Sequence, residues 1–122
     1  MVQRGDRLIY CGGALAALYQ TLGGRAIMAG KPHAPIYDLA LDAAQSAFDH
    51  SLDRARVLAI GDGLATDIAG AAAQALDARF IATGIHGEVF LSQGGALDAG
   101  RLDRLAAAGG PAIAFAMPDL VW

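Results

Sequence analysis

The chain has 122 residues and a formal net charge of −3, which suits one domain with one modest core. It contains no cluster of lysine or arginine, so the composition argues against nucleic-acid binding. The longest uncharged run, residues 8–24, is interrupted by glycines and polar residues and makes a poor membrane span. The single cysteine, Cys11, excludes an intramolecular disulfide. Without a recognisable signal peptide, the chain is expected to be cytoplasmic.

The first strand and helix are predicted before residue 25. Residues 7–11 form an apolar run that predicts a short strand with Cys11 as a packed thiol. Residues 14–22 carry leucines at helical spacing. Gly23 and Gly24 are expected to end that helix, at the position where positive φ is needed.

A second strand and helix follow. Residues 25–30 predict a short strand that ends in a turn. A helix is expected over residues 35–48, because Pro32 and Pro35 suit a helix entry, where the missing N–H carries no penalty. The apolar positions of that helix that we expect to face inward are Ile36, Leu39, Ala40, Ala43, Ala44 and Ala47.

The centre of the chain predicts a strand directly followed by a helix. Residues 57–60 read VLAI, a continuous apolar run with a β-branched residue at each end. This pattern is typical of a parallel strand that is buried on both faces. Residues 67–76 are expected to form the helix, with Thr66 as its N-cap.

The remaining segments complete the fold class. Residues 78–84 predict another strand, residues 98–108 a helix, and residues 111–122 a final strand with an apolar tail. Strands that alternate with helices indicate an α/β fold with a parallel sheet flanked by helices.

Two carboxylates lie where the central strand stops and its helix starts. Ligands of open parallel sheets bind beyond the carboxyl ends of the strands, and Asp62 lies at such an end. Asp67 is five residues further on, so the loop between them can bring both carboxylates together. Two hard oxygen ligands suit Mg²⁺. The alternative is that Asp62 caps a turn and Asp67 complements the helix dipole.

The glycines of this region do not fit three familiar motifs. Gly61 and Gly63 begin a G-x-G-x-x-G pattern, but Thr66 stands at the third position. A P-loop ending at Lys31 would need glycine where Arg25 stands. The alternating acidic ligands of an EF-hand loop are absent.

A lysine and three histidines are further candidates. Lys31 is expected after a strand and before a helix, where it could reach a phosphate as a point charge or remain a solvated surface lysine. His33 is a polar residue at the helix entry or a substrate contact. His86 follows a strand end and could face the same site, whereas His50 belongs to a loop. None of these histidines has metal-ligand spacing.

The segments GKP and GDGLATD, followed by IAGAAAQ, resemble the haloacid dehalogenase (HAD) superfamily of phosphohydrolases. The stretch from Gly12 to Leu41 is similar to class IIA of that superfamily, in which a large cap precedes the lysine motif. The resemblance implies a Rossmann-like core, a Mg²⁺ cofactor and a small phosphate monoester of sugar-phosphate or nucleotide type as substrate.

The resemblance also implies roles for individual residues. Lys31 would be the catalytic lysine that steadies the negative charge of the nucleophile and the phosphoryl group. Asp62 would ligate Mg²⁺ directly or through water, and Asp67 would hold the metal's waters or support the ligands. Gly63 and His33 are the candidate substrate contacts.

Two motifs of the family are missing. The chain contains no D-x-D pair to supply a nucleophile and a general acid. Thr83 ends a strand as the family's second motif does, but it lies after the metal motif, in the wrong order. We therefore expect residues 1–28 to be a remnant of the cap and residues 29–122 to be the C-terminal part of the core, inactive in isolation.

Partners follow from that expectation. Without the family's first strand, apolar sheet edges would be exposed, so self-association or a missing N-terminal segment is expected to complete the sheet. Two alternatives stay open. One is a non-catalytic binding or assembly module built from the same half-fold; the other, a receiver-like domain, lacks the required early acidic cluster.

Overall fold

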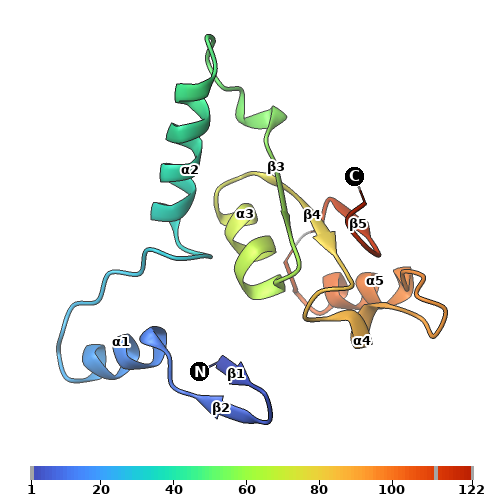
Figure 1. Cartoon of the computed structure of the whole chain (residues 1–122), viewed down its shortest axis with the longest axis horizontal. Coiled ribbons are helices and arrows are strands. Elements are labelled where there is room, and N and C mark those ends of the chain that lie inside the picture. The colour runs from blue at the N-terminus through green and yellow to red at the C-terminus, as the bar shows by residue number, and fades with distance from the viewer. Residues whose placement is uncertain (1, 112, 122) are drawn as a thin grey trace.

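The chain consists of an α/β core and an N-terminal arm that stands apart from it (Figure 1). The computed structural model describes residues 2–111 and 113–121. The core is a parallel sheet in the order β3 (Leu58–Gly61), β4 (Asp77–Ile81) and β5 (Phe115–Met117). The predicted α/β fold with a parallel sheet is confirmed.

Helices flank this sheet. A π-helical turn, η2 (Leu64–Ile68), runs directly into α3 (Ala69–Ala73), and the two pack on β3 and β4. The short helices α4 (Gly87–Phe90) and α5 (Ala99–Ala107) pack against each other. A 3₁₀ turn, η1 (Arg54–Arg56), precedes β3.

Two predicted helices begin at different kinds of cap. The helix predicted over 98–108 is confirmed as α5. Asp98 is its N-cap, because the Asp98 side chain accepts a hydrogen bond from the N–H of Arg101 at 3.1 Å. The N-cap predicted at Thr66 is wrong. The helical region begins at Gly63, whose carbonyl accepts the N–H groups of Asp67 and Ile68 at 2.8 and 3.1 Å, so Thr66 lies inside η2.

The hydrophobic core is small and centred on β4. Phe80 and Ile68 are fully buried, and the ring of Phe90 meets that of Phe80 edge-on at 5.3 Å. The other buried apolar side chains are Ala71, Leu76, Ala78, Ile81 and Ala82. The core is therefore built from β4, the helical segment before it, and the loop and helix α4 after it.

The strand β3 is more exposed than its sequence predicts. It pairs with β4 alone, so it is an edge strand of the described sheet. Leu58 is 38% exposed and Ile60 is 44% exposed. The prediction that VLAI is buried on both faces is wrong for this structure, because no described segment covers the free edge of β3.

The N-terminal arm comprises β1 (Val2–Arg4), β2 (Arg7–Ile9) and α1 (Gly12–Thr21). The strand predicted over 7–11 forms only as β2, and it pairs with β1 in an antiparallel hairpin, outside the parallel sheet. Cys11 is the N-cap of α1 and lies in no strand, because the helix begins at the following glycine.

The predicted end of α1 is confirmed, whereas the strand predicted after it is not. Gly23 has φ +85°, so the predicted helix end is confirmed. The strand predicted over 25–30 is wrong: this segment is extended coil without a neighbouring strand to pair with in the described chain. None of the helices in the described residues is long and apolar enough to cross a membrane.

The helix predicted over 35–48 is confirmed as α2 (Ala34–Ala47), with prolines at its start. The predicted inward face is wrong for Ile36 and Leu39, which are 38% and 67% exposed, whereas Ala40 and Ala44 do line a groove beside the core. The helix instead turns Tyr37 toward the core, and Leu41 and Ala44 lie on the same stripe at helical spacing.

Candidate active site

The candidate site lies at the carboxyl end of β3. Asp62 follows the last residue of that strand, and Asp67 sits in the first helical turn behind it. The wide turn of η2 brings the Asp67 side chain back over the loop, where its Oδ2 accepts the N–H of Gly63 at 2.9 Å. The chain thus brings both predicted carboxylates to the same end of the sheet.

Asp67 is the most highly connected of these residues. It is the one polar or charged residue among the described residues that is buried, with 9% exposure. Its Oδ1 accepts a hydrogen bond from the Nζ atom of Lys31, which forms an ion pair across 36 positions in the sequence. Both carboxylate oxygens of Asp67 are therefore occupied by protein donors.

Lys31 keeps an exposed face despite this bond. Its side chain is 53% exposed, and an ammonium group has three N–H donors, so two remain available. The hydrogen bond to Asp67 is the main cause that raises the pKa of Lys31 above its ordinary value of 10.5. Lys31 is therefore a fixed positive charge that can also face a ligand.

Two glycines make room for Asp67. A Cβ added to Gly61 would overlap Cγ of Asp67, and one added to Gly63 would overlap Oγ1 of Thr66. Both separations would fall below 3.0 Å, so these positions need the missing side chain for close approach. The GDG sequence is explained by crowding around the carboxylates, and neither glycine has positive φ.

Asp62 is held from the neighbouring strand. Its Oδ2 accepts the N–H of Ile85 at 3.0 Å, in the loop that follows β4. Gly84 lies so close that an added Cβ would overlap the same oxygen. Among the hydrogen bonds of the described residues none engages Oδ1 of Asp62, so this oxygen is available to a cation.

Tyr37 is a site residue that the sequence analysis missed. Its hydroxyl lies 3.3 Å from the carbonyl oxygen of Asp67 and 3.4 Å from that of Thr66, to which it donates. Burial, with the Asp67 charge as a second cause, raises the pKa of Tyr37. Its place in the helix that begins soon after Lys31 is the sequence feature that could have identified it as a site residue. Tyr37 fixes the helix that follows the lysine to the turn that carries the carboxylate.

The strand β5 also contributes to the end of the sheet where the candidate site lies. The Thr83 hydroxyl donates to Oδ1 of Asp119 at 3.1 Å, and the Thr83 N–H donates to the carbonyl of Pro118 at 2.8 Å. These bonds join the ends of β4 and β5. They hold the loop whose next residues, Gly84 and Ile85, meet Asp62, a role that the sequence did not reveal.

The other predicted residues are placed differently. Gly63 uses its N–H on Asp67, which leaves that donor no free direction for a substrate. His33 is exposed at the N-cap of α2 and makes no side-chain capping bond. His86 packs beside the Phe80 and Phe90 pair, with its ring centroid 6.3 Å from that of Phe80 and 6.1 Å from that of Phe90. The roles assigned to Gly63 and His33 stay predictions.

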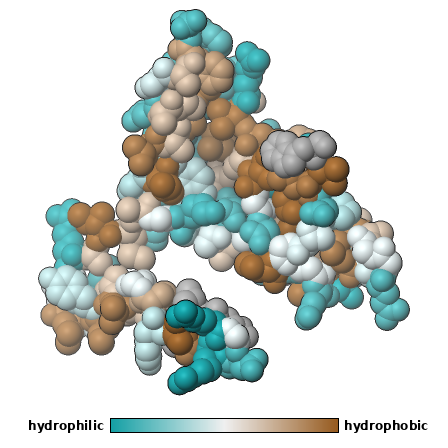
Figure 2. Space-filling view, in the orientation of Figure 1, coloured by the Kyte–Doolittle hydropathy of each residue, from teal (hydrophilic) through white to brown (hydrophobic). Residues whose placement is uncertain are grey.

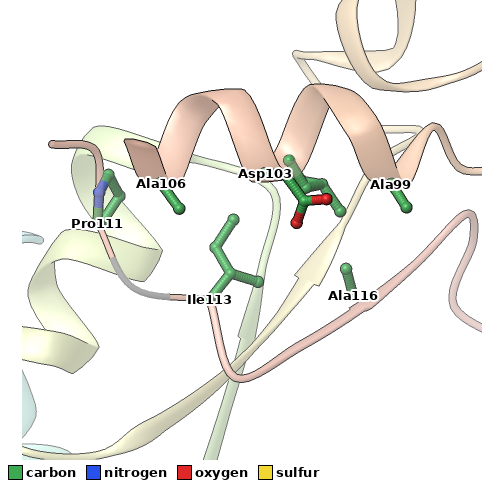
Figure 3. A pocket seen from close by; sticks show the side chains of 7 residues that line it. Ala99, Asp103, Ala106, Pro111, Ile113 and Ala116 are labelled. Atoms are coloured by element: carbon green, nitrogen blue, oxygen red, sulfur yellow. The ribbon is translucent and has the colours of Figure 1, made fainter. Parts of the chain in front are cut away.

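A separate pocket lies between α5 and β5 and has a volume of about 210 Å³ (Figure 3). Apart from Asp103, its lining is apolar, and the carboxylate of Asp103 points into it beside Ile113 and Ala116. This carboxylate shares no hydrogen bond with Lys31 or Asp67, so it supplies a control residue outside the candidate site.

The carboxylates of Asp62 and Asp67 are the side chains of this site that could bind a divalent cation. No group of three histidine, cysteine, aspartate or glutamate side chains within the described ranges could enclose a metal. Mg²⁺ needs no such cage, because it binds through one or two carboxylates and completes its shell with waters and substrate phosphates. Asp62 with a free oxygen, supported by Asp67, fits this requirement. The arrangement suits an anionic group held between a hard cation and Lys31.

Comparison with known proteins identifies the family. A family model described as HAD-hydrolase-like matches residues 28–107, which includes Lys31, Asp62 and Asp67. The chain therefore belongs to the HAD-like hydrolases.

Two solved structures are similar over nearly the whole chain. A hydrolase of the haloacid dehalogenase-like family from Brucella suis 1330 is 43% identical, with a TM-score of 0.67 over 99% of this chain and 41% of its own. A possible sugar phosphatase of the HAD superfamily from Cytophaga hutchinsonii ATCC 33406 is 21% identical. Its TM-score is 0.64 over 98% of this chain and 38% of its own, and this likeness concerns the fold alone.

The chain spans about two-fifths of the length of these two proteins. The search of curated proteins found no match.

Proposed function

We propose that this chain supplies the lysine and metal-binding part of a Mg²⁺-dependent hydrolase of small phosphate monoesters. The observation that carries the proposal is the linkage of Lys31 to Asp67, and of Asp67 to Gly63, beside Asp62 at one strand end. A sugar-phosphate or nucleotide substrate, class IIA membership and a cytoplasmic location belong to the same proposal.

Each side chain would have a distinct task. Asp62, with one oxygen free, would hold Mg²⁺ directly or through water. Asp67, with both oxygens bonded by protein donors, would orient Lys31 and the metal's waters. Lys31 would neutralise charge on the phosphoryl oxygens through its exposed N–H groups. A bound Mg²⁺ would supply further neutralisation of that charge, which is the main requirement of phosphoryl transfer.

The attacking group would come from outside these residues. The sequence has no D-x-D pair to supply the attacking carboxylate and the general acid. We therefore expect the isolated chain to bind Mg²⁺ weakly and to hydrolyse no aryl phosphate.

A Mg²⁺ titration followed by amide NMR tests the proposal. Signals of Gly63 and Ile85, which bond to the two carboxylates, should shift in the wild type and in Asp103→Asn, but not in Asp62→Asn. Equal shifts in Asp62→Asn and Asp103→Asn would contradict the assigned metal site.

Phosphatase activity is the second measurement. We expect no turnover of an aryl phosphate with or without Mg²⁺. Mg²⁺-dependent turnover that is lost in Asp62→Asn would show that another residue of this chain attacks phosphorus, and it would overturn the division of roles given above.

One observation favours a different function. The free edge of β3, with Ile60 44% exposed, is the kind of surface used by a non-catalytic assembly module. Such a module would form a stable assembly and show no Mg²⁺-dependent shift at Gly63 or Ile85, so the same titration distinguishes the two functions.

A further inference from the structure

The parallel sheet has one face that the hydrophobic core does not use. Side chains alternate between the two faces along each strand. Ala59, Ala78, Phe80 and Ala116 belong to the core cluster, so their face is the one that packs on the described helices. The residues between them point to the opposite side, which we call the open face. It includes Leu58, Ile60, Asp77, Arg79, Phe115 and Met117.

The open face is largely apolar and accessible. Leu58, Ile60 and Phe115 are 38%, 44% and 48% exposed. Arg79 extends across this face toward β5, where its guanidinium carbon lies 5.8 Å from the centroid of the Phe115 ring and its Nη1 lies 3.9 Å from Sδ of Met117. Exposed apolar side chains grouped around an arginine are typical of surfaces where proteins associate.

The open face also carries one charge of each sign. Asp77 and Arg79 are two positions apart on β4, so their side chains leave the sheet on the same side. Neither takes part in an ion pair among the described residues. A surface that covers this face without leaving charges unpaired must present the same two charges in the reverse order along the strand. An identical strand that runs in the opposite direction has that order.

The strand register makes the face complementary to itself. It pairs Leu58 with Asp77 and Ile60 with Arg79. We consider a twofold axis in the plane between two such faces, which crosses the strands midway between these two levels. The axis places each strand antiparallel to its own copy and exchanges the levels. Asp77 then faces Arg79 of the other copy, and Leu58 faces Ile60 of the other copy, each contact occurring twice.

We propose that two copies of this chain pack through their open faces, with Asp77 of each copy paired with Arg79 of the other. Charge complementarity favours a second copy as the occupant, because one axis aligns both the charged pairs and the apolar pairs. The contact uses none of Lys31, Asp62 and Asp67, so it is independent of the proposed function.

Sedimentation equilibrium of the full chain over a range of concentrations tests the assembly. We expect a reversible equilibrium between monomer and dimer. Asp77→Arg and Arg79→Asp each place like charges opposite one another and should raise the dissociation constant at least about tenfold. Asp42→Arg, at an exposed position of α2, changes the net charge as Asp77→Arg does and should leave the constant unchanged. A wild type that stays monomeric, or equal constants for all these variants, would overturn the proposal.

Mixing the two charge variants tests the direction of the strands. One variant carries two arginines at positions 77 and 79, and the other carries two aspartates. The mixture should therefore form a heterodimer about as tightly as the wild type dimerises, although each variant alone is weakened. Circular dichroism checks that each variant is folded. Two folded variants that do not associate on mixing would contradict the antiparallel packing.

The wild type alone provides a second measurement, which does not depend on the folding of any variant. In a mixture of isotope-labelled and unlabelled chains, a filtered nuclear Overhauser effect should join the methyl groups of Ile60 in one copy to those of Leu58 in the other. A dimer without this contact would overturn the proposed face. A dimer with this contact but no Mg²⁺-dependent shift at Gly63 or Ile85 would uphold the packing and contradict the proposed function.

Discussion

The first fifty residues and the sheet region both contain many apolar side chains, but these side chains are buried to very different degrees. No described side chain among residues 4–50 is buried, whereas Phe80, Ile68 and Ala82 in the sheet region are completely inaccessible. In the arm, Leu18 is 58% exposed and Leu22 is 78% exposed, and Figure 2 shows this apolar surface over α1.

This difference shows what makes a core in so short a chain. The helix α1 has leucines at helical spacing and a well-formed end, yet no described sheet lies against it. The sheet region gains its burial from parallel pairing of segments far apart in sequence. Local pattern produces elements, and only non-local partners remove their apolar faces from water.

Phe80→Ala should give the largest effect, because it empties the centre of the core. We expect the free energy of unfolding to fall by about 3–5 kcal/mol, measured by urea denaturation. Leu18→Ala in the arm should change it by less than about 0.5 kcal/mol. Similar losses for the two variants would mean that α1 is buried in solution.

Gly61→Ala should have the next largest effect. The new Cβ would overlap Cγ of Asp67, so that carboxylate must move and weaken its bonds to Gly63 and Lys31. We expect a loss of about 1–3 kcal/mol in the same denaturation assay. Gly12→Ala is the matched control, because a Cβ at the start of α1 meets open space. A Gly61→Ala variant as stable as the control would contradict the crowding.

Helix ends allow a sharper comparison of the two regions. α1 and α3 end in the same motif, in which Gly24 N–H bonds to Tyr19 O and Leu76 N–H bonds to Ala71 O, each at 3.0 Å. The left-handed residue is Gly23 in α1 but Ala75, with φ 54°, in α3.

Ala75→Gly should therefore stabilise the core by about 1 kcal/mol, because it removes the left-handed strain of an alanine. Gly23→Ala introduces the same strain into α1 and should lower helicity by circular dichroism without moving the urea midpoint of the core. A shift of that midpoint by Gly23→Ala would show that the arm and the core unfold together.

The smallest expected effect concerns pH and the bond between Lys31 and Asp67. The pKa of Lys31 is raised in the folded protein, so its contribution to stability is present below pH 10.5 and is lost as pH rises through the folded value. The difference in unfolding free energy between wild type and Lys31→Met should be below about 1 kcal/mol, because the lysine is half exposed.

The comparison with Lys31→Met isolates this group, since Tyr37, whose pKa is also raised, titrates in both proteins. Urea denaturation across the alkaline range provides the measurement. A difference that grows as the pH increases would have the wrong sign and would contradict the ion pair.

Features that depend only on neighbouring residues in the sequence, such as helix ends, were predicted well. Asp98 at a helix start and Gly23 at a helix end each act through their own neighbouring backbone, so their outcomes followed from the sequence. The strand expected over 25–30 and the buried state of β3 depended on partners elsewhere. An apolar run predicts that a segment can be buried, but it does not identify the strand or helix that packs against it.

The candidate site divides in the same way. Asp62 and Asp67 were identified from their spacing, because one strand and one turn place them both. Tyr37 was missed, although it lies six residues after Lys31, because its contact is with backbone carbonyls, which leave no mark on sequence. The hydrogen bond from Ile85 to Asp62 links the loops that follow β3 and β4 through a main-chain N–H, so the sequence did not predict it either.

The burial of Asp67 has a consequence for the order of local opening. Lys31 holds its side chain and Tyr37 holds its backbone carbonyl, and both donors come from α2 or the segment just before it. Detaching α2 therefore breaks both contacts at once and leaves a carboxylate without its cation. Native-state hydrogen exchange should find the amides of α2 and the first turn of η2 opening as a single cooperative unit, at a lower free energy than the amides of β4.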